Sequence, residues 1–401
     1  MLQASLASGT AERRTVFELF GRRLPEGRRY GVVAGVGRAL DALERFCFDE
    51  PTLARLARWR FTGDVWGYAE GETYVPGSPL LVVEAPFAEA VLLETLLLSI
   101  YNHDSAIASA ASRMTRAAGG RACIEMGSRR THEEAAVAAA RAAYVAGFAG
   151  SSNLAARQRY GVPTTGTSAH AFTLLHDSET DAFRAQVDSL GAGTTLLVDT
   201  YDVAEAVRLA VEVAGDDLGA VRLDSGDLAD LAHQVRAQLD RLGADRTRIV
   251  VTSDLDEHAI AALGSAPVDS YGVGTQLVTG SGHPTVGLVY KLVAREGADG
   301  ELVGVAKRST AKESWPGRHW ARRRHDATGS ATAEVVGTGT PPPPADGERD
   351  LLVPLVRSGE VVGREPLEAA RERHARSRDA LPMASRSLLR GEPELPTVRV
   401  S

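Results

Sequence analysis

The sequence predicts an α/β protein whose central part consists of parallel strands and crossover helices, arranged either as a barrel or as an open sheet. The first observation is an alternation of short apolar runs and helical patterns that begins at residue 121 and continues for about 160 residues. The second is that a polar cluster follows nearly every one of these apolar runs. The third is length, because 401 residues can bury a large core without disulfides or a structural metal.

Composition and charge exclude several classes of protein. The net charge of −7 argues against a general binder of nucleic acid or of anionic membranes. Cys47 and Cys123 are too few for a disulfide framework or a cysteine zinc site. The best apolar stretch, at 90–100, is interrupted by Glu94 and is too short to span a bilayer. The N-terminus lacks the apolar region of a signal peptide, so we expect a cytoplasmic enzyme.

The two flanks of the alternating region are expected to fold together. Residues 1–85 contain strand-like runs separated by proline and glycine turns, and 87–118 keeps apolar residues at helical spacing. Beyond the alternating region, two runs predict antiparallel strands that return to the N-terminal part. The proline-rich stretch 337–350 is expected to be a loop, followed by a hairpin at 351–363 and a charged helix at 365–381.

The alternating region predicts six strands and five helices. The strands are expected at 122–125, 162–165, 194–199, 219–223, 248–252 and 268–271. The helices are expected at 132–147, 178–190, 203–213, 228–242 and 257–263. Three of the helices begin with capping-box signals, namely Thr131 with Glu134, Asp202 with Glu205, and Asp254 with Glu257.

The polar clusters at the strand ends are the strongest functional signal. They occupy 127–130, 165–170, 199–202, 222–227, 253–254 and 272–275. The carboxyl ends of parallel strands meet at one edge of a sheet or barrel, so we expect a single site there. Candidate substrate-binding residues in these clusters include Thr167, Asp199, Ser225, Ser253 and Asp254.

The segment VRLDSGDL combines an arginine with two aspartates. Arg222 can pair with a phosphate or carboxylate, and Asp224 and Asp227 can bind sugar hydroxyls or a hydrated magnesium ion. The alternative is a helix start, in which Asp224 or Ser225 caps the next helix and Asp227 lies in its first turn. A cap requires no arginine in the preceding strand end, so we favour a functional role for Arg222 and Asp224. For Asp227 both interpretations stay open.

Two further clusters suggest phosphate chemistry. Gly272, Gly274 and Thr275 lie in a glycine-rich loop whose backbone N–H groups can approach a phosphate. His170 lies just after a predicted strand, where it can act as a nucleophile, as a proton carrier or as a structural histidine. No histidine, cysteine or carboxylate spacing predicts a metal site built from protein side chains.

Eight motifs, taken in order, carry a family resemblance. They are GSRR (127–130), GSSNLAARQRYGVPTTGTSAH (150–170), LLVDTYD (196–202), RLDSGDL (222–228), SDLDE (253–257), GVGTQL (272–277), VYKLV (289–293) and KESWPGR (312–318). Together they span most of the chain, and the chain resembles the nicotinate phosphoribosyltransferase family (a type II phosphoribosyltransferase-like fold).

The resemblance implies an irregular TIM-like α/β barrel with a second, smaller α/β domain built from the N-terminal and post-barrel segments. The implied division is 1–110 for the N-terminal part of the small domain, 111–284 for the barrel with the active site, 285–336 for the return to the small domain, and 337–401 for the proline-rich loop, hairpin and helix.

The resemblance also implies the reaction. Nicotinate and phosphoribosyl pyrophosphate give nicotinate mononucleotide and pyrophosphate, a step of NAD biosynthesis and salvage. ATP is a co-substrate that is hydrolysed through a phosphohistidine, and Mg2+ is required. A homodimer is implied, and neither nucleic acid nor a membrane is expected as a partner.

Individual roles follow from the same resemblance. His170 matches the phosphorylated histidine, and Arg222 with Asp224 matches the catalytic pair at the phosphoribosyl site. Arg129 matches an arginine near the pyridine carboxylate and the pyrophosphate. The loop with Gly272, Gly274 and Thr275 matches the 5′-phosphate loop.

Ser152 and Asn153 lie where related nicotinamide-using enzymes carry an aspartate. A neutral residue at this place suits the anionic nicotinate, because an aspartate would repel its carboxylate. Asn153 thus disfavours the alternative of a nicotinamide phosphoribosyltransferase. Another barrel enzyme acting on a sugar phosphate is a further alternative.

The start of the sequence departs from the family pattern. Members begin with a Thr-Asp-x-Tyr-type segment whose aromatic residue reaches the pyridine ring, whereas this sequence begins MLQASLASGTAERR. We expect that the native protein continues upstream. Without that segment, a catalytically impaired homologue that only binds nucleotide is the remaining alternative, and the presence of His170, Arg129, Arg222 and Asp224 argues against it.

Overall fold

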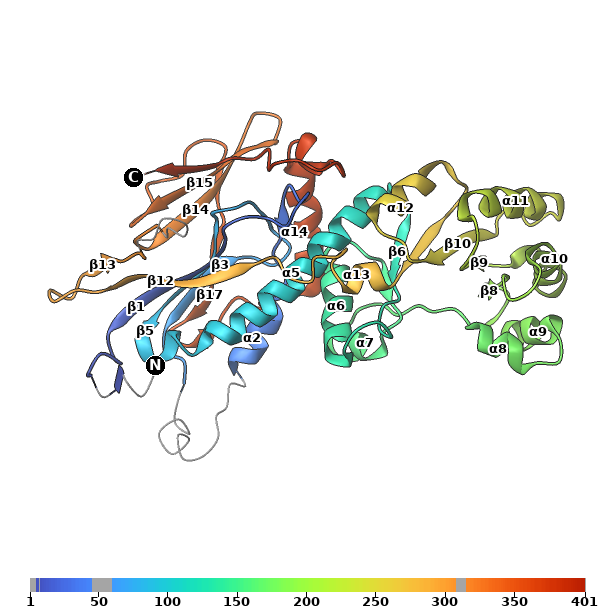
Figure 1. Cartoon of the computed structure of the whole chain (residues 1–401), viewed down its shortest axis with the longest axis horizontal. Coiled ribbons are helices and arrows are strands. Elements are labelled where there is room, and N and C mark those ends of the chain that lie inside the picture. Colours follow the sequence, from blue (N-terminus) through green and yellow to red (C-terminus); the bar gives the residue numbers. More distant parts are fainter. Residues whose placement is uncertain (1–4, 7, 45–59, 308–314, 401) are drawn as a thin grey trace. The chain divides into compact units, whose positions relative to one another are not determined.

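The structure is a computed structural model that describes residues 5–6, 8–44, 60–307 and 315–400. It forms two compact units (Figure 1). Unit 1 comprises Met1–Ser109 and His283–Ser401, and unit 2 comprises Ala110–Gly282. Unit 2 is therefore inserted in sequence between the two parts of unit 1. The first three residues of the KESWPGR motif lie outside the described residues.

A seven-stranded antiparallel sheet is the centre of unit 1. Its order is β13 (Leu302–Gly304), β12 (Leu288–Glu296), β1 (Arg14–Gly21), β5 (Pro79–Pro86), β3 (Asp64–Tyr68), β17 (Leu352–Arg357) and β18 (Glu360–Val361). Glu18 of β1 lies opposite Val82 of β5 and Lys291 of β12, so distant parts of the chain meet at this strand. The hairpin expected at 351–363 is present as β17 and β18.

Smaller sheets complete unit 1. A four-stranded sheet has the order β16 (Glu348–Asp350), β14 (His319–His325), β15 (Ala331–Thr338) and β19 (Thr397–Val400), and β2 (Gly31–Val32) pairs with β4 (Thr73–Tyr74). The expectation of a loop throughout 337–350 is wrong at both ends. β15 includes the first two of these residues and β16 the last three, because both strands pair with β14.

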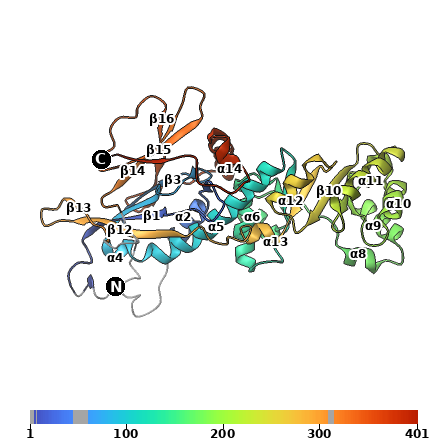
Figure 2. The same ribbon diagram turned by 45° about the horizontal axis from the view of Figure 1, so that its top comes forward.

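The helices of unit 1 are α2 (Val36–Glu44), α4 (Phe87–Ala90), α5 (Leu93–Ala117), α14 (Leu367–Ala380) and the 3-10 turn η3 (Ala384–Arg386). The single helix expected at 87–118 is divided at residues 91–92, and the backbone N–H groups of Phe87 and Ala88 tie the start of α4 to the carbonyls of Arg13 and Ala11 before β1. α5 then lies along the sheet (Figures 1 and 2), and its Leu93 and Leu97 enter the core with Leu19 of β1.

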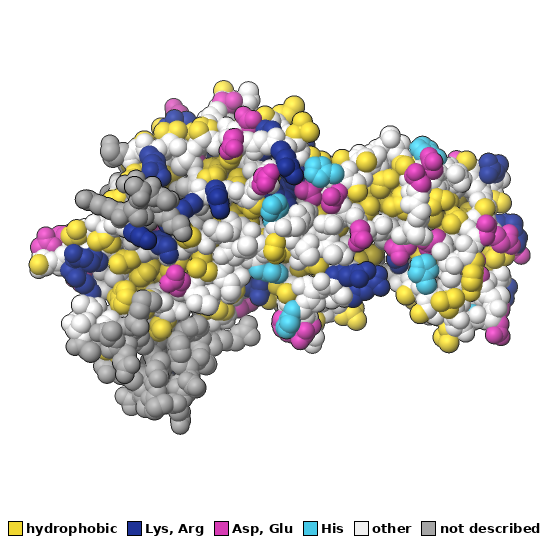
Figure 3. All heavy atoms as spheres, in the orientation of Figure 1, with side chains coloured by type: hydrophobic (Ala, Val, Ile, Leu, Met, Phe, Trp, Pro, Cys, Tyr) yellow, Lys and Arg dark blue, Asp and Glu magenta, His cyan; other side chains and the backbone are white. Residues whose placement is uncertain are grey.

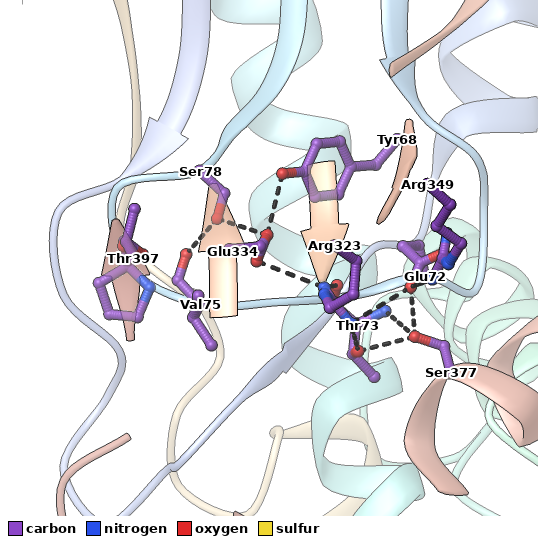
Figure 4. A network of polar contacts seen from close by, with 11 residues as sticks. Tyr68, Glu72, Thr73, Val75, Ser78, Arg323, Glu334, Arg349, Ser377 and Thr397 are labelled. Atoms are coloured by element: carbon purple, nitrogen blue, oxygen red, sulfur yellow. Dashed lines mark hydrogen bonds and ion pairs between the residues drawn. The ribbon is translucent and has the colours of Figure 1, made fainter. Parts of the chain in front are cut away.

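A buried polar network links the sheets of unit 1 (Figure 4). Arg323 of β14 is fully buried, lies 3.3 Å from Oε2 of Glu334 and 3.6 Å from Oε1 of Glu72, and donates to the Thr73 carbonyl at 2.7 Å. Tyr68 donates to Glu334 at 2.9 Å. Such buried charges are tolerated only when each is paired and hydrogen bonded. The network therefore joins β3, β14 and β15.

Unit 2 contains a parallel sheet of six strands. Its order is β7 (Gly150–Ser151), β6 (Ala122–Glu125), β11 (Ser270–Val273), β10 (Arg248–Ser253), β9 (Ala220–Leu223) and β8 (Thr195–Leu197), and all neighbours are parallel. The prediction of a mixed α/β fold is confirmed. The sheet is curled as half of a barrel, and among the described residues β7 and β8 are its two edges.

One predicted strand is misplaced. The run at 162–165 contributes only an isolated bridge between Thr164 and Ser151, whereas the strand itself is β7. Pro163 lacks a backbone donor, and its carbonyl accepts the N–H of Ser151. The helix α7 (Leu154–Tyr160) between them is also absent from the predicted set.

The other helices of unit 2 are α6 (Glu133–Val145), α8 (His170–Leu175), α9 (Glu179–Leu190), α10 (Val203–Ala214), α11 (Leu228–Arg241), α12 (Glu257–Ala262) and α13 (Thr275–Val278), with 3-10 turns η1 (Gly215–Asp217) and η2 (Leu263–Ser265). All five expected helices are present with small shifts at their ends.

The capping residues agree with the prediction at one helix of three. Asp202 caps α10 by accepting the N–H of Glu205 at 2.8 Å, as predicted. α6 is capped by His132 rather than Thr131, and α12 by Asp256 rather than Asp254. Asp256 accepts two backbone N–H groups, which leaves Asp254 outside the helix.

The surface mixes all side-chain types. On the face shown in Figure 3, basic, acidic and hydrophobic side chains are interspersed. In unit 2, large apolar side chains stand exposed, among them Leu175 of α8 at 79% and Leu190 of α9 at 68%. No helix among the described residues has both the length and the apolar character needed to cross a membrane.

Candidate active site

Arg222 and Asp224 lie at the carboxyl end of β9 and are paired. Nη2 of Arg222 lies 2.9 Å from Oδ1 of Asp224. Arg222 also donates from Nε to Thr252 at 2.8 Å, and from Nη1 to the hydroxyl of Thr167 at 2.6 Å and the carbonyl of Ser168 at 3.3 Å. These bonds hold the guanidinium in one orientation. A fixed, planar guanidinium suits the recognition of phosphate or carboxylate groups.

The carboxylate of Asp224 is held ionised. Partial burial raises its pKa, but hydrogen bonds from Thr252 and Arg222, with the charges of Arg222 and His170, outweigh burial and leave the pKa below its ordinary value. Asp224 is not a helix cap. Asp227 is the cap of α11, accepting the N–H of Asp230 at 3.2 Å, so the structural interpretation applies to Asp227.

His170 is the first residue of α8 and lies beside two aspartates. Its Nδ1 is 3.2 Å from the hydroxyl of Thr200, and its Nε2 is 3.9 Å from Asp199 and 3.8 Å from Asp224. The ring is 41% exposed, so a substrate can reach it. This arrangement favours the ring proton on Nε2, near the two carboxylates, and leaves Nδ1 facing the Thr200 hydroxyl.

Asp199 joins the ends of β8 and β9. Its Oδ2 accepts the backbone N–H of Asp224 and the hydroxyl of Ser225, each at 2.9 Å. Its Oδ1 is buried and accepts no hydrogen bond from the described residues. A buried carboxylate oxygen without a donor has capacity for a cation or a ligand hydroxyl.

A cavity of about 210 Å³ lies at the same strand ends. Its lining includes the candidate residues Arg129, Arg222, Asp224, Ser253, Asp254, Gly272, Gly274 and Thr275. Arg129 and its neighbour Arg130 are exposed, and neither pairs with another described residue. Two unpaired guanidinium groups at the mouth of a polar cavity suit an anionic ligand.

The remaining candidates do not line this cavity. They are Ser152, Asn153, Thr167, His170, Asp199, Ser225 and Asp227. Thr167 lines a separate pocket with Ser168 and Phe172. Asn153 caps α7, accepting the N–H of Ala156 at 2.9 Å, and donates to Ser128 at 3.0 Å, next to Arg129. The side chain of Ser152 is exposed. Among the described residues, no three histidine, cysteine or carboxylate side chains cluster as metal ligands.

The sequence does not single out Thr252 or Glu125 as site residues. Thr252 bonds both Arg222 and Asp224, and Glu125 is fully buried where β6 ends. The available signal is position, because both are among the last two residues of a parallel strand.

Gly272 is required by packing. A Cβ there would lie 2.4 Å from Cγ2 of Thr252 and 2.7 Å from Sδ of Met126. The glycine thus lets β11 approach the residues that hold the Arg222–Asp224 pair.

Comparison with known proteins identifies the family. Residues 122–318 match the sequence pattern of the nicotinate phosphoribosyltransferase (NAPRTase) family. The chain is 59% identical over 418 residues to the nicotinate phosphoribosyltransferase pncB1 of Mycobacterium tuberculosis, covering 99% of this chain and 92% of that protein. It is 39% identical to the nicotinate phosphoribosyltransferase of Bacillus subtilis, covering 79% and 70% of the two chains.

Solved structures show the same relationship. The human nicotinic acid phosphoribosyltransferase superposes with a TM-score of 0.85 at 25% identity, covering 100% of this chain and 96% of that chain. The nicotinate-nucleotide pyrophosphorylase of Pyrococcus furiosus superposes with a TM-score of 0.80 at 25% identity, covering 94% and 92%. With high identity over nearly its full length, the chain belongs to the nicotinate phosphoribosyltransferase family.

Proposed function

We propose that the chain joins nicotinate to phosphoribosyl pyrophosphate and releases nicotinate mononucleotide and pyrophosphate, as an enzyme of NAD biosynthesis. Family membership supports the reaction. The single observation that carries the site is the Arg222–Asp224 pair, held by Thr252 of β10 and by Thr167 beside a cavity with two unpaired arginines.

The arrangement suggests a role for each group. Asp224, ionised, accepts hydrogen bonds from ribose hydroxyls, and Arg222 balances the charge around the phosphorylated ribose. Arg129 pairs with the nicotinate carboxylate or the pyrophosphate, and Gly272 and Gly274 let the β11 loop approach the 5′-phosphate. In this proposal Thr275, Ser225, Ser253, Asp254, Thr167, Ser152 and Asn153 complete the substrate contacts.

The chemical step exchanges one bond at the anomeric carbon. The C1–oxygen bond breaks, pyrophosphate leaves with the electron pair, and the pyridine nitrogen forms the new bond to C1. Arg129 is placed to stabilise the charge that develops on the leaving group, and Arg222 holds the ribose side in a fixed position. Arg222 needs to move little, because it is already held by Thr252 and Thr167.

His170 is proposed to couple ATP to this reaction. The nearby carboxylates of Asp199 and Asp224 favour the proton on Nε2, and Nδ1 then acts as the nucleophile once its contact with the Thr200 hydroxyl is released. A bond forms between Nδ1 and the γ-phosphorus of ATP as the bond to the bridging oxygen breaks, and ADP leaves with that electron pair. Hydrolysis of the phosphohistidine restores the ring.

The residues present fit magnesium bound together with a substrate phosphate. Mg2+ is usually held by one or two carboxylates and by phosphate oxygens. Asp199, with its buried and unbonded Oδ1, and Asp224 would supply the protein ligands. The ion, when bound, neutralises charge on the pyrophosphate.

We also propose the larger architecture that the resemblance implies. The curled sheet would belong to an irregular α/β barrel at 111–284, with the smaller domain built from 1–110, 285–336 and 337–401. The enzyme would act as a cytoplasmic homodimer, in which the partner covers apolar side chains such as Leu175 and Leu190.

The test of this function is product formation from nicotinate and phosphoribosyl pyrophosphate, measured with and without ATP, and beside nicotinamide in place of nicotinate. We expect nicotinate mononucleotide, faster with ATP, and little product from nicotinamide. His170→Ala should abolish nicotinate-stimulated ATP hydrolysis, whereas His258→Ala, at an exposed position on α12, should not. Full ATP coupling in the His170 variant would overturn the role of that residue.

A further inference from the structure

A fully buried carboxylate lies beneath the loops that carry Arg129 and Asn153. Glu125 is the last residue of β6 and has no exposed surface. One of its oxygens accepts the backbone N–H of Gly127, and the other accepts the hydroxyl of Ser151 at the end of β7. Glu125 therefore bonds both to Gly127, the first residue of the loop 127–130, and to Ser151, the first residue of the loop 151–153.

The hydrogen bonds continue into a closed ring. The hydroxyl oxygen of Ser151 accepts the backbone N–H of Asn153 at 2.8 Å. The side-chain amide of Asn153 donates to Ser128 at 3.0 Å, and Ser128 follows Gly127 in the first loop. The ring thus joins the carboxyl ends of β6 and β7. Arg129 lies in the loop that follows β6, and α7 follows β7.

The chemistry of the ring requires an acceptor at position 125. Both groups that face Glu125, an N–H and an O–H, are donors. A carboxylate can accept both, whereas a glutamine amide has one acceptor oxygen and presents N–H groups on the other side. Burial raises the pKa of Glu125 above its ordinary value, and the bonds from Ser151 and Gly127 offset only part of that shift. A costly buried carboxylate is thus retained where a neutral isostere cannot make the same bonds.

We propose that Glu125 is a positioning residue that joins the loops 127–130 and 151–153 into one unit and so sets the spacing between Arg129 and Asn153. The kinetic consequence rests on the proposed function, and it takes the alternative in which Arg129, like Asn153, contacts the nicotinate rather than the pyrophosphate. The joining of the loops can be measured without any ligand.

The first measurement is hydrogen exchange on the full-length protein without substrates. In Glu125→Gln, amides in both loops should exchange at least about tenfold faster, although the loops are distant in sequence. The matched control is Glu18→Gln. Glu18 is also buried and accepts one backbone N–H and one side-chain donor, both from His319 at 2.8 and 2.7 Å. If exchange became faster in only one of the two loops, or in none, the inference would be overturned.

The second measurement is steady-state kinetics of product formation. We expect Glu125→Gln to raise the KM for nicotinate at least about fivefold and to change the KM for phosphoribosyl pyrophosphate less than about twofold, a split that general loss of stability does not produce. If Glu125→Gln raised both KM values equally, or if Glu18→Gln raised the KM for nicotinate by the same factor, the role of Glu125 would be merely structural.

Two additional variants keep these outcomes distinct. Arg129→Ala reports on the proposed function itself. If Arg129→Ala leaves the KM for nicotinate unchanged, the assignment of Arg129 to the nicotinate fails. The hydrogen-exchange data would still show whether Glu125 joins the two loops. If Glu125→Gln does not fold, Ser151→Ala removes the hydroxyl between Glu125 and Asn153 and should give the same pattern.

Discussion

Arg222 and Asp224 form an ion pair with 2.9 Å between Nη2 and Oδ1, and Thr252 of the neighbouring strand bonds to both of them. Side chains two positions apart at a strand end project to the same face, so an arginine and an aspartate at this spacing meet without any loop rearrangement. The two charges therefore form one prearranged unit, and a ligand meets a single, fixed set of donors and acceptors.

Asp224→Asn should lower kcat/KM by about 100-fold, because it removes the charge that balances Arg222 and the acceptor proposed for ribose hydroxyls. The measurement is initial rate against phosphoribosyl pyrophosphate, with the melting temperature as a check on folding. Asp240→Asn is the matched control, since Asp240 also pairs with an arginine (Arg236, 2.7 Å) but on the exposed face of α11. Similar effects of the two substitutions would contradict a role for Asp224 in the reaction.

Asn153→Asp should shift selectivity from nicotinate toward nicotinamide. Aspartate caps helices as well as asparagine, so the bond to Ala156 and the start of α7 should survive. The new negative charge should raise the KM for nicotinate by roughly tenfold and leave that for nicotinamide unchanged or lower. Parallel assays with the two substrates check this, and an equal loss with both would argue for damage to the loop instead.

Gly272→Ala should weaken the site through packing. Its Cβ would overlap Thr252 and Met126, which lie at 2.4 and 2.7 Å, and relieving the overlap should cost about 1–3 kcal/mol of stability. Displacement of Thr252 should also raise the KM for phosphoribosyl pyrophosphate. Gly264→Ala is the control, because nothing lies within 4 Å of its added Cβ. Chemical denaturation and kinetics of the two variants test the difference.

Glu179 should make unfolding depend on pH. Burial, followed by the charges of Glu205 and Asp202, raises its pKa to about 7. A glutamate in the unfolded chain has a pKa of about 4.3. Between pH values of about 4.3 and 7 the folded state therefore holds an extra proton, and the free energy of unfolding falls as pH rises through this range.

Glu179→Gln should remove that dependence. We expect it to raise the free energy of unfolding by about 1 kcal/mol at pH 8, since solvent screens part of the effect, and to change it little at pH 4. Denaturation at several pH values is the measurement. Glu212→Gln, at an exposed position that pairs with Arg208, is the control. A parallel shift at all pH values would show that Glu179 stays ionised.

Arg323→Met should destabilise unit 1 by about 3–5 kcal/mol, because Glu72 and Glu334 would stay buried without their cation. Its neighbour on β14, Arg324, is 46% exposed and pairs with Glu348 at the surface. Arg324→Met should therefore cost less than about 1 kcal/mol. Calorimetry of both variants measures the difference, and equal costs would show that the buried network adds nothing to stability.

The sequence predicts the sheet of unit 2 well where strands are long enough to show a pattern. β6, β9, β10 and β11 each contain four or more residues, and their positions follow from short apolar runs between helices. β7 has two residues, which is too short for any periodicity, and depends on pairing with β6.

The site is predictable where function depends on local spacing. Arg222 and Asp224 meet because they are two residues apart. The cap of α11 was not predictable in the same way, because Asp224, Ser225 and Asp227 are all capping residues. Asp199, which follows β8, accepts hydrogen bonds from the backbone N–H of Asp224 and the hydroxyl of Ser225. Asp227 is the residue that caps α11.

The insertion of unit 2 within unit 1 has a consequence for biosynthesis. On the ribosome, β1 can pair early with β5, but its other edge lacks its partner β12 until all of unit 2 has been made. Unit 2 is continuous in sequence, so all of its strands and helices have been synthesised before β12 is made. The inserted unit can therefore finish folding first, while the first half of unit 1 presents an open strand edge of the kind that promotes aggregation. Unit 1 can complete its central sheet only after β12 has been made, so its folding has to follow the synthesis of the inserted unit.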